Sequence, residues 1–239
     1  MEYIIFIKQV YYYFFIPILT IAGSTILFKV IPLNSFIRST LHYFSAGVVF
    51  AAISIELIPE IYKNSYKFNV ILGYLLGSSL MLLMQALIVR YKKLSTNPTS
   101  ELLTLLITVG IDIFIDGLLL GVSFVINVEK GIVMITALSI ELLFLILSVN
   151  SSLDKINKKM RFIILLNFTY ILLVVLGISL GLIFINCSRD IIITMCAFAT
   201  AAFLYLVVEE LLREAHKENG NQFSALMFFI GFLIILIIK

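Results

Sequence analysis

The sequence predicts an all-α membrane protein with eight transmembrane helices, and composition is the first reason. Of its 239 residues 62% are hydrophobic, whereas soluble domains are about 45–50% apolar. Only 13% of the residues are charged, and the mean hydropathy is +1.13. Eight apolar segments reach or approach the length of about 20 residues that crosses a bilayer. We therefore expect one transmembrane domain over residues 1–239.

The expected spans are separated by turn residues and charges, such as Pro32-Leu-Asn-Ser before the second and Asn127-Val-Glu-Lys-Gly before the fifth. Their ranges are 9–31, 40–62, 68–91, 102–126, 132–150, 161–185, 191–212 and 222–238. No basic segment precedes the first span and no small-residue cleavage site follows it, so we expect it to be retained rather than removed as a signal peptide.

The orientation follows from the positions of Lys and Arg, which gather on the cytoplasmic side of membrane proteins. With eight spans, six of the 17 basic residues fall on the side of the two termini and eleven on the other side. The sequence therefore predicts that both termini are extracytoplasmic.

Three carboxylates interrupt the apolar spans near mid-membrane. Asp112 and Asp116 lie four residues apart on one face of the fourth span, and Glu141 lies near the middle of the fifth. Each ionised group at this depth costs about 2.5–3.5 kcal/mol on insertion scales. Since no Lys or Arg lies near the middle of any span, the cluster requires protons or a bound cation. A hydrogen-bonded structural cluster with partners such as Ser139 is the alternative.

Further acids lie toward the ends of the second and seventh spans. Glu56 and Glu60 are expected near the outer surface, and Glu210 and Glu214 near the cytoplasm. Glu60 and Glu214 have the positions of solvated helix ends, whereas Glu56 and Glu210 lie a turn deeper. We interpret the four as lining a path to and from the mid-membrane carboxylates.

These two segments also indicate an internal repeat. A shift of 154 residues brings identical residues together: Glu56 with Glu210, Leu57 with Leu211, Glu60 with Glu214, Gly23 with Gly177 and Gly77 with Gly231. Spans one to three then correspond to spans six to eight with opposite direction. This predicts a 3+2+3 arrangement with an inverted repeat, which is typical of transporters with a mid-membrane site.

Four segments carry polar motifs: ELIPE (56–60), DIFIDG (112–117), ALSIELLFL (137–145) and YLVVEELLRE (205–214). With them the whole chain resembles the ZIP (Zrt/Irt-like) family of divalent-metal transporters. DIFIDG stands in the frame of the family motif H-N-x-x-[DE]-G, where Asp116 and Gly117 match and Asp112 replaces histidine. Glu141 and Glu56 take histidine positions of the fifth-span and second-span motifs. The glutamate of the sixth-span motif E-P-x-G is missing from VVLG (174–177).

The resemblance implies eight spans with both termini outside, a homodimer, and a metal site made here by Asp112, Asp116 and Glu141. Both histidines, His42 and His216, lie near span ends, so the ligands are oxygen atoms. Such ligands favour harder ions such as manganese, magnesium or calcium, and tolerate ferrous iron, whereas zinc prefers nitrogen and sulfur. The metal is cargo, and no prosthetic group is expected.

We therefore expect a carrier that moves divalent cations such as manganese, iron or zinc toward the cytoplasm, with lipid and metal ion as its partners. A non-transporting ZIP-like subunit with a binding or assembly role is the alternative, because several motifs are altered. An enzyme is not expected, since intramembrane aspartyl chemistry needs two carboxyls on facing helices, whereas Asp112 and Asp116 share one helix. The small net charge of +3 calls for no nucleic acid partner.

Overall fold

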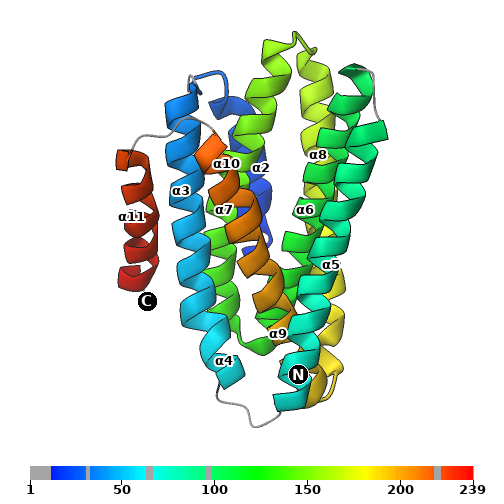
Figure 1. Ribbon diagram of the computed structural model, residues 1–239, viewed down its shortest axis with the longest axis vertical. Helices are drawn as coiled ribbons and strands as arrows, with labels where there is room; N and C mark the ends of the chain where they lie inside the picture. The colour runs from blue at the N-terminus through cyan, green and yellow to red at the C-terminus, as the bar shows by residue number, and fades with distance from the viewer. Residues whose placement is uncertain (1–11, 31–32, 63–66, 95–97, 218–221, 239) are drawn as a thin grey trace.

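The structure is a computed structural model that describes residues 12–30, 33–62, 67–94, 98–217 and 222–238. Regular structure in these residues is helical, with no strand among them. The helices form an elongated bundle and most run along its long axis (Figure 1). The prediction of an all-α fold is confirmed. The beginning of the expected first span and both chain ends lie outside the described residues.

Eight helical units make up the described part of the bundle. Five are single helices: α2 (Phe15–Leu27), α5 (Lys67–Leu94), α6 (Pro98–Ile126), α7 (Val128–Lys155) and α11 (Gln222–Ile238). In two others a π-helical segment interrupts the α-helix: α3 (Ser35–Ala52), η1 (Ile53–Leu57) and α4 (Ile58–Tyr62), and α9 (Arg189–Tyr205), η3 (Leu206–Leu211) and α10 (Leu212–Lys217). The last unit is α8 (Met160–Leu182), which ends in the 3-10 segment η2 (Ile183–Asn186).

Six units are long and apolar enough to cross a membrane, and the two shorter apolar helices are Phe15–Leu27 and Phe223–Ile238. All eight coincide with expected spans, but several extend beyond them. The fifth, expected over 132–150, is Val128–Lys155. It begins early because the Asn127 side chain accepts a hydrogen bond of 3.1 Å from the Glu129 N–H. Hydropathy marks only the part of a helix inside the bilayer, whereas the helix continues into polar sequence.

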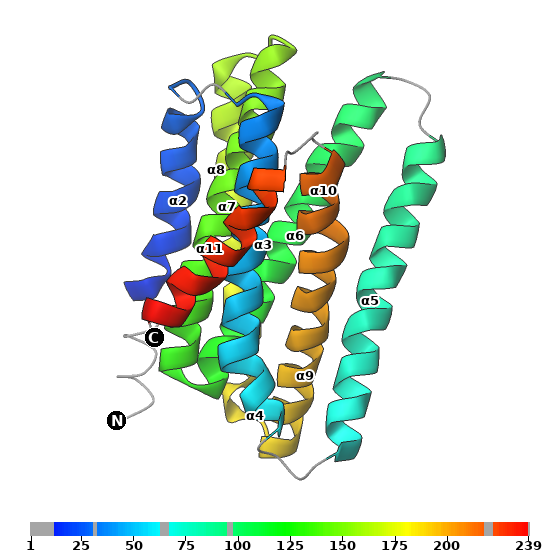
Figure 2. The ribbon, with the colours of Figure 1, turned by 60° about the vertical axis from the view of Figure 1, so that its left-hand side comes forward.

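Successive units run in opposite directions along the bundle (Figures 1 and 2). At the end where α3 begins and α7 ends, the basic residues include Lys29, Arg38, Arg90, Lys155, Lys158, Lys159, Arg161, Arg213 and Lys217. At the other end they are Lys67, Lys130 and Arg189. We call these the basic end and the opposite end.

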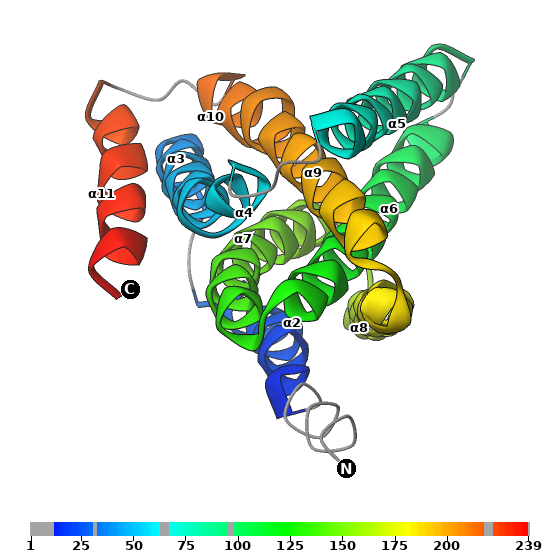
Figure 3. The same cartoon turned by 90° about the horizontal axis from the view of Figure 1, so that it is seen from below.

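The helices α6 and α7 pack side by side, with α5, α8 and α9 along α6 and α2 and α3 along α7 (Figure 3). The main packing partners are α6 with α8, α3 with α11, α5 with α9, and α2 with α7. Where α6 meets α8, a Cβ added to Gly177 would lie 2.3 Å from the Phe114 carbonyl oxygen, and one added to Gly117 2.5 Å from the Val174 carbonyl oxygen. The two backbones therefore touch, as at other membrane helix contacts built on small residues. This contact holds α8 against the turn of α6 that carries Asp116.

The two π-helical segments occupy positions 154 residues apart. The Ile58 N–H bonds to the Ile53 carbonyl, and the Leu212 N–H bonds to the Val207 carbonyl. Both are the i to i−5 bonds that define a π-helix. Such segments are rare and occur frequently at functional sites. Each holds one of the glutamates that coincide in the sequence repeat, Glu56 or Glu210.

The close helix contacts recur with the same spacing. A Cβ on Gly77 of α5 would lie 2.5 Å from the Phe198 carbonyl oxygen of α9. A Cβ on Gly231 of α11 would lie 2.4 Å from the Phe44 carbonyl oxygen of α3. Both members of the second pair differ from those of the first by 154 positions. The α5–α9 and α3–α11 contacts are therefore built alike.

Candidate carboxylate site

The central helix α6 places Asp116 deep in the bundle. This side chain is 1% exposed, and neither carboxyl oxygen has a hydrogen-bond partner among the described residues. Its sequence neighbour Gly117 lies against the Val174 carbonyl of α8, so the backbone around Asp116 cannot move outward from the bundle. Asp112, one turn away on the same helix, projects instead into a cavity.

Glu141 on α7 lies next to Asp116. Glu141 is buried, and its Oε2 lacks a hydrogen-bond donor among the described residues. The carboxyl groups of Asp116 and Glu141 are near enough to share a hydrogen bond if one of them carries a proton. As two carboxylates they would both be acceptors and would repel each other. A proton or a cation between them is the arrangement that removes this repulsion.

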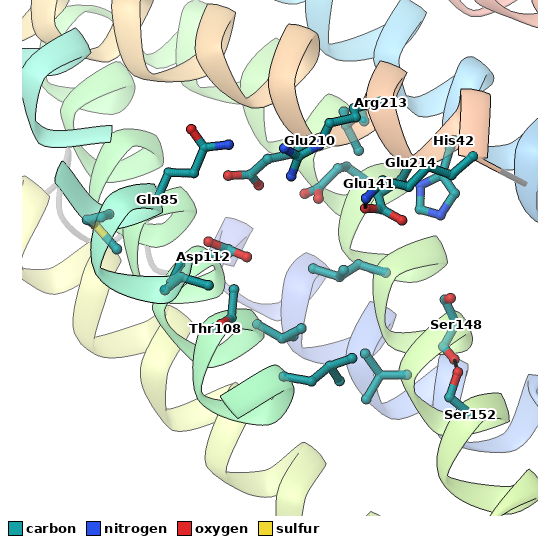
Figure 4. Close-up of a pocket in the computed structure, with 18 of the residues that line it drawn as sticks. His42, Gln85, Thr108, Asp112, Glu141, Ser148, Ser152, Glu210, Arg213 and Glu214 are labelled. Carbon is teal, nitrogen blue, oxygen red and sulfur yellow. Dashed lines mark hydrogen bonds and ion pairs between the residues drawn. The ribbon is translucent and has the colours of Figure 1, made fainter. Parts of the chain in front are cut away.

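A cavity of about 420 Å³ extends from this level to the basic end. Asp112, Glu141 and Glu210 project into it from α6, α7 and η3 (Figure 4). Toward the basic end its lining includes Arg38, His42, Ser148, Ser152, Glu214 and Lys217. The cavity thus connects the mid-bundle carboxylates with the basic end.

Four carboxylates form one electrostatic cluster: Asp112, Asp116, Glu141 and Glu210. Glu210 lies near enough to each of the other three to repel it. The cation that most affects Glu210 is Arg213. Within the described residues, however, no three His, Cys, Asp or Glu side chains are close enough together to hold a metal ion as they stand. Side-chain rotation into the cavity would be needed to bring oxygen atoms around one ion.

The four acids predicted to line a path divide into two pairs. Glu210 and Glu214 line the cavity. Glu56 is 3% exposed and is not part of the cavity lining, and Glu60 forms an ion pair of 2.5 Å with Lys130 at the opposite end. This pair links α4 to α7 at the opposite end of the bundle.

Sequence reasoning assigned Glu210 to the outgoing path, whereas the structure also brings it to Asp112 and Glu141. It did not single out Gln85 of α5, which lines the cavity and accepts a hydrogen bond from the Tyr205 hydroxyl of α9. The signal for Gln85 was an uncharged amide inside the apolar stretch MLLMQALIV. The signal for Glu210 was the internal repeat, in which it coincides with Glu56.

The fold and this cavity define a class: a multi-span helical membrane protein with buried carboxylates accessible from one end. A family model described as ZIP zinc transporter matches residues 90–239. The match covers more than half of the sequence and includes Asp112, Asp116, Glu141 and Glu210, and the chain belongs to the ZIP family. No curated protein matches the chain. Membership and the apolar helices indicate an integral membrane protein, and members of this family are transporters of divalent metal ions rather than enzymes.

Proposed function

We propose that the protein is a carrier that moves divalent cations toward the cytoplasm through the carboxylate cavity. The observation that carries this proposal is Asp116, a fully buried carboxylate without a hydrogen-bond donor among the described residues, next to Glu141, which lines the cavity. The cost of such a group at mid-membrane is offset when a cation or a proton binds.

In this proposal Asp112, Asp116 and Glu141 bind the metal, and Glu210 assists from the cavity wall. The basic end faces the cytoplasm, because Lys and Arg gather there, and both termini are extracytoplasmic. Metal enters past Glu56 and Glu60 in another conformation and leaves past Glu210 and Glu214 in the one described here. Oxygen-only ligands favour manganese or iron over zinc.

The proposed architecture is a single domain in which spans one to three and six to eight form an inverted repeat around α6 and α7. The matched π-helical segments and the matched glycine contacts support it. Inverted repeats, which are related by a pseudo-two-fold axis in the membrane plane, permit two conformations that open the central site to opposite sides. This is the basis of alternating access. A homodimer, as the resemblance implies, is part of the same proposal.

The test is uptake of manganese, iron, zinc, cadmium and magnesium into proteoliposomes. We expect Asp116→Asn to abolish uptake of every ion that the unmodified protein carries, because an amide oxygen lacks the charge that binds the cation. The matched control is Asp190→Asn, the same change at an exposed residue in the first turn of α9, which should leave uptake unchanged. Normal uptake by Asp116→Asn would contradict the proposed site.

The second candidate is a ZIP-like subunit that binds or assembles without transporting. The observation that favours it is that the described acids do not converge into a ready metal site. It predicts that folded protein in liposomes moves none of the five ions. Uptake of any one of them that is lost in Asp116→Asn would exclude it.

A further inference from the structure

A second cavity lies between α5 and α6, toward the basic end of these helices. Its volume is about 370 Å³, within the range of about 300–1,000 Å³ that small-ligand sites occupy. It is lined by Met84, Leu87 and Ile88 from α5 and by Thr104, Ile107, Thr108 and Ile111 from α6. We call it the α5–α6 groove.

The groove offers an almost purely apolar surface. Thr108 donates its hydroxyl hydrogen to the Thr104 carbonyl, 2.8 Å away on the same helix, so this polar hydrogen is satisfied within α6. Leu87 and Ile107, from opposite walls, are both exposed at the surface of the bundle. A surface of this kind inside the membrane span is in contact with hydrocarbon rather than with water.

The groove adjoins the carboxylate cavity. Met84, Ile88 and Thr108 line both, so these three side chains form the boundary between them. A sideways opening at this boundary would bring hydrocarbon next to Asp112 and Glu210, where ionised groups are costly. An apolar occupant of the groove would keep water and ions inside the cavity.

The chemistry of the groove favours an acyl chain as that occupant. A helix is about 10 Å wide with its side chains, which is wide for a groove of this volume. A non-helical peptide segment would bring N–H and C=O groups that the lining cannot hydrogen-bond, which is expensive in the membrane. An acyl chain has no such groups. Arg90 is exposed on α5, three residues beyond Leu87 and about 4.5 Å further along the helix axis toward the basic end. A negatively charged headgroup beside Arg90 would therefore direct its chain into the groove.

We propose that the α5–α6 groove binds one acyl chain of an anionic phospholipid, with the headgroup at Arg90, and that this chain seals the side of the carboxylate cavity. Binding of the lipid follows from the groove and Arg90 alone. Its effect on ion movement rests on the proposed function. A test that reads lipid contact directly therefore separates failure of this proposal from failure of the transport proposal.

The chain contains no tryptophan, so a single introduced tryptophan reports its own surroundings by fluorescence. Leu87→Trp places the reporter in the groove. Leu82→Trp is the matched control, because Leu82 lies on α5 outside the groove and is 56% exposed, compared with 55% for Leu87. The two positions are about 140° apart around the helix. Each variant is reconstituted in nanodiscs of phosphatidylcholine with phosphatidylglycerol, and one of the two lipids carries bromine, a quencher, at several positions along its chains.

We expect brominated phosphatidylglycerol to quench Leu87→Trp about fivefold more effectively than brominated phosphatidylcholine, the preference that one basic residue gives an anionic lipid. Leu82→Trp should be quenched equally by both lipids. Adding Arg90→Gln to Leu87→Trp should remove the preference. If Leu87→Trp does not fold, Ile107→Trp reports the groove from α6.

Two results would overturn the proposal. Equal quenching of Leu87→Trp by both lipids would show that the groove is in contact only with bulk lipid. Protection from both quenchers would show that protein, such as a second copy of the chain, covers it. Neither result depends on metal binding or uptake, so the measurement stands whether or not the protein transports.

Discussion

The helices at 35–62 and 189–217 carry the same elements in the same order, but their surroundings differ. Each has a π-helical segment with a glutamate, followed one turn later by a second glutamate. Glu56 is buried outside the cavity, whereas Glu210 lines it. Glu60 pairs with Lys130 of another helix. Glu214 pairs at 2.6 Å with Lys217 of its own helix.

This difference shows that the local motif does not determine whether its glutamate lines the cavity. An ion pair between two helices holds the ends of α4 and α7 together, whereas a pair within α10 leaves the neighbouring helices free to separate. The described conformation therefore has a cavity that extends to the basic end, and Glu56 is buried outside it. In the proposed transport cycle the two halves would exchange these roles.

The largest expected effect distinguishes the two glutamates by solvent access. In a background of Cys187→Ser and Cys196→Ala, Glu210→Cys should react with a membrane-impermeant thiol reagent added at the basic end. Glu56→Cys should be protected from reagent added at the opposite end, because it is buried in this conformation. The labelling rates are read by mass spectrometry. Comparable labelling of both positions, each from its own side, would mean that the described conformation does not dominate.

A smaller effect concerns the repeat-related glycines. Gly177→Ala should destabilise the fold by about 1–3 kcal/mol, the usual cost of overpacking, because its Cβ would lie 2.3 Å from the Phe114 carbonyl oxygen. Gly23→Ala should be neutral or slightly stabilising, since nothing lies within 4 Å of that Cβ. Thermal unfolding in detergent measures both.

Gly77 and Gly231 provide the control for this comparison, because both have a carbonyl oxygen within 2.5 Å of the added Cβ. Gly77→Ala and Gly231→Ala should therefore destabilise the fold to a similar extent. Equal tolerance of alanine at Gly23 and Gly177 would show that α6 and α8 do not approach as closely as described.

The smallest effect tests the ion pair at the opposite end. Lys130→Gln should increase labelling of Glu56→Cys from that end by about fivefold, because a partly exposed ion pair contributes up to about 1 kcal/mol. The Lys130 side chain is 15% exposed and that of Glu60 28%. Lys67→Gln removes a charge at the same end, from an exposed residue, and should not change the labelling rate. If both variants increase it alike, net charge rather than the ion pair controls access.

Much of the fold could be predicted because membrane helices have a strong local signal. Apolar stretches of bilayer length marked all eight helices, and the last was predicted with its observed bounds, 222–238. The ends of the other helices were less accurate. Asn34 and Asn127 cap helices at residues that hydropathy places outside the membrane. The π-helical segments were not predicted, since ISIEL and LVVEEL read as ordinary α-helix.

The site was predictable only in part. A charge in an apolar span is visible in any sequence, so Asp112, Asp116, Glu141 and Glu210 were all identified. The sequence did not show which of these acids line the cavity, because that depends on how each helix is rotated about its own axis. Asp116 and Asp112 share a face by spacing, yet only Asp112 reaches the cavity.

The sequence by itself determined that this chain is an all-helical integral membrane protein and which acids lie within its apolar helices. These properties depend on the free energy of transferring single side chains and short segments from water into the membrane. This free energy is set locally along the sequence. The tertiary structure alone decided that Glu210 lines one cavity with Asp112 and Glu141, that Glu60 pairs with Lys130, and that the cavity extends to the basic end. These depend on close backbone contacts between distant helices, and hydropathy carries no information about such contacts.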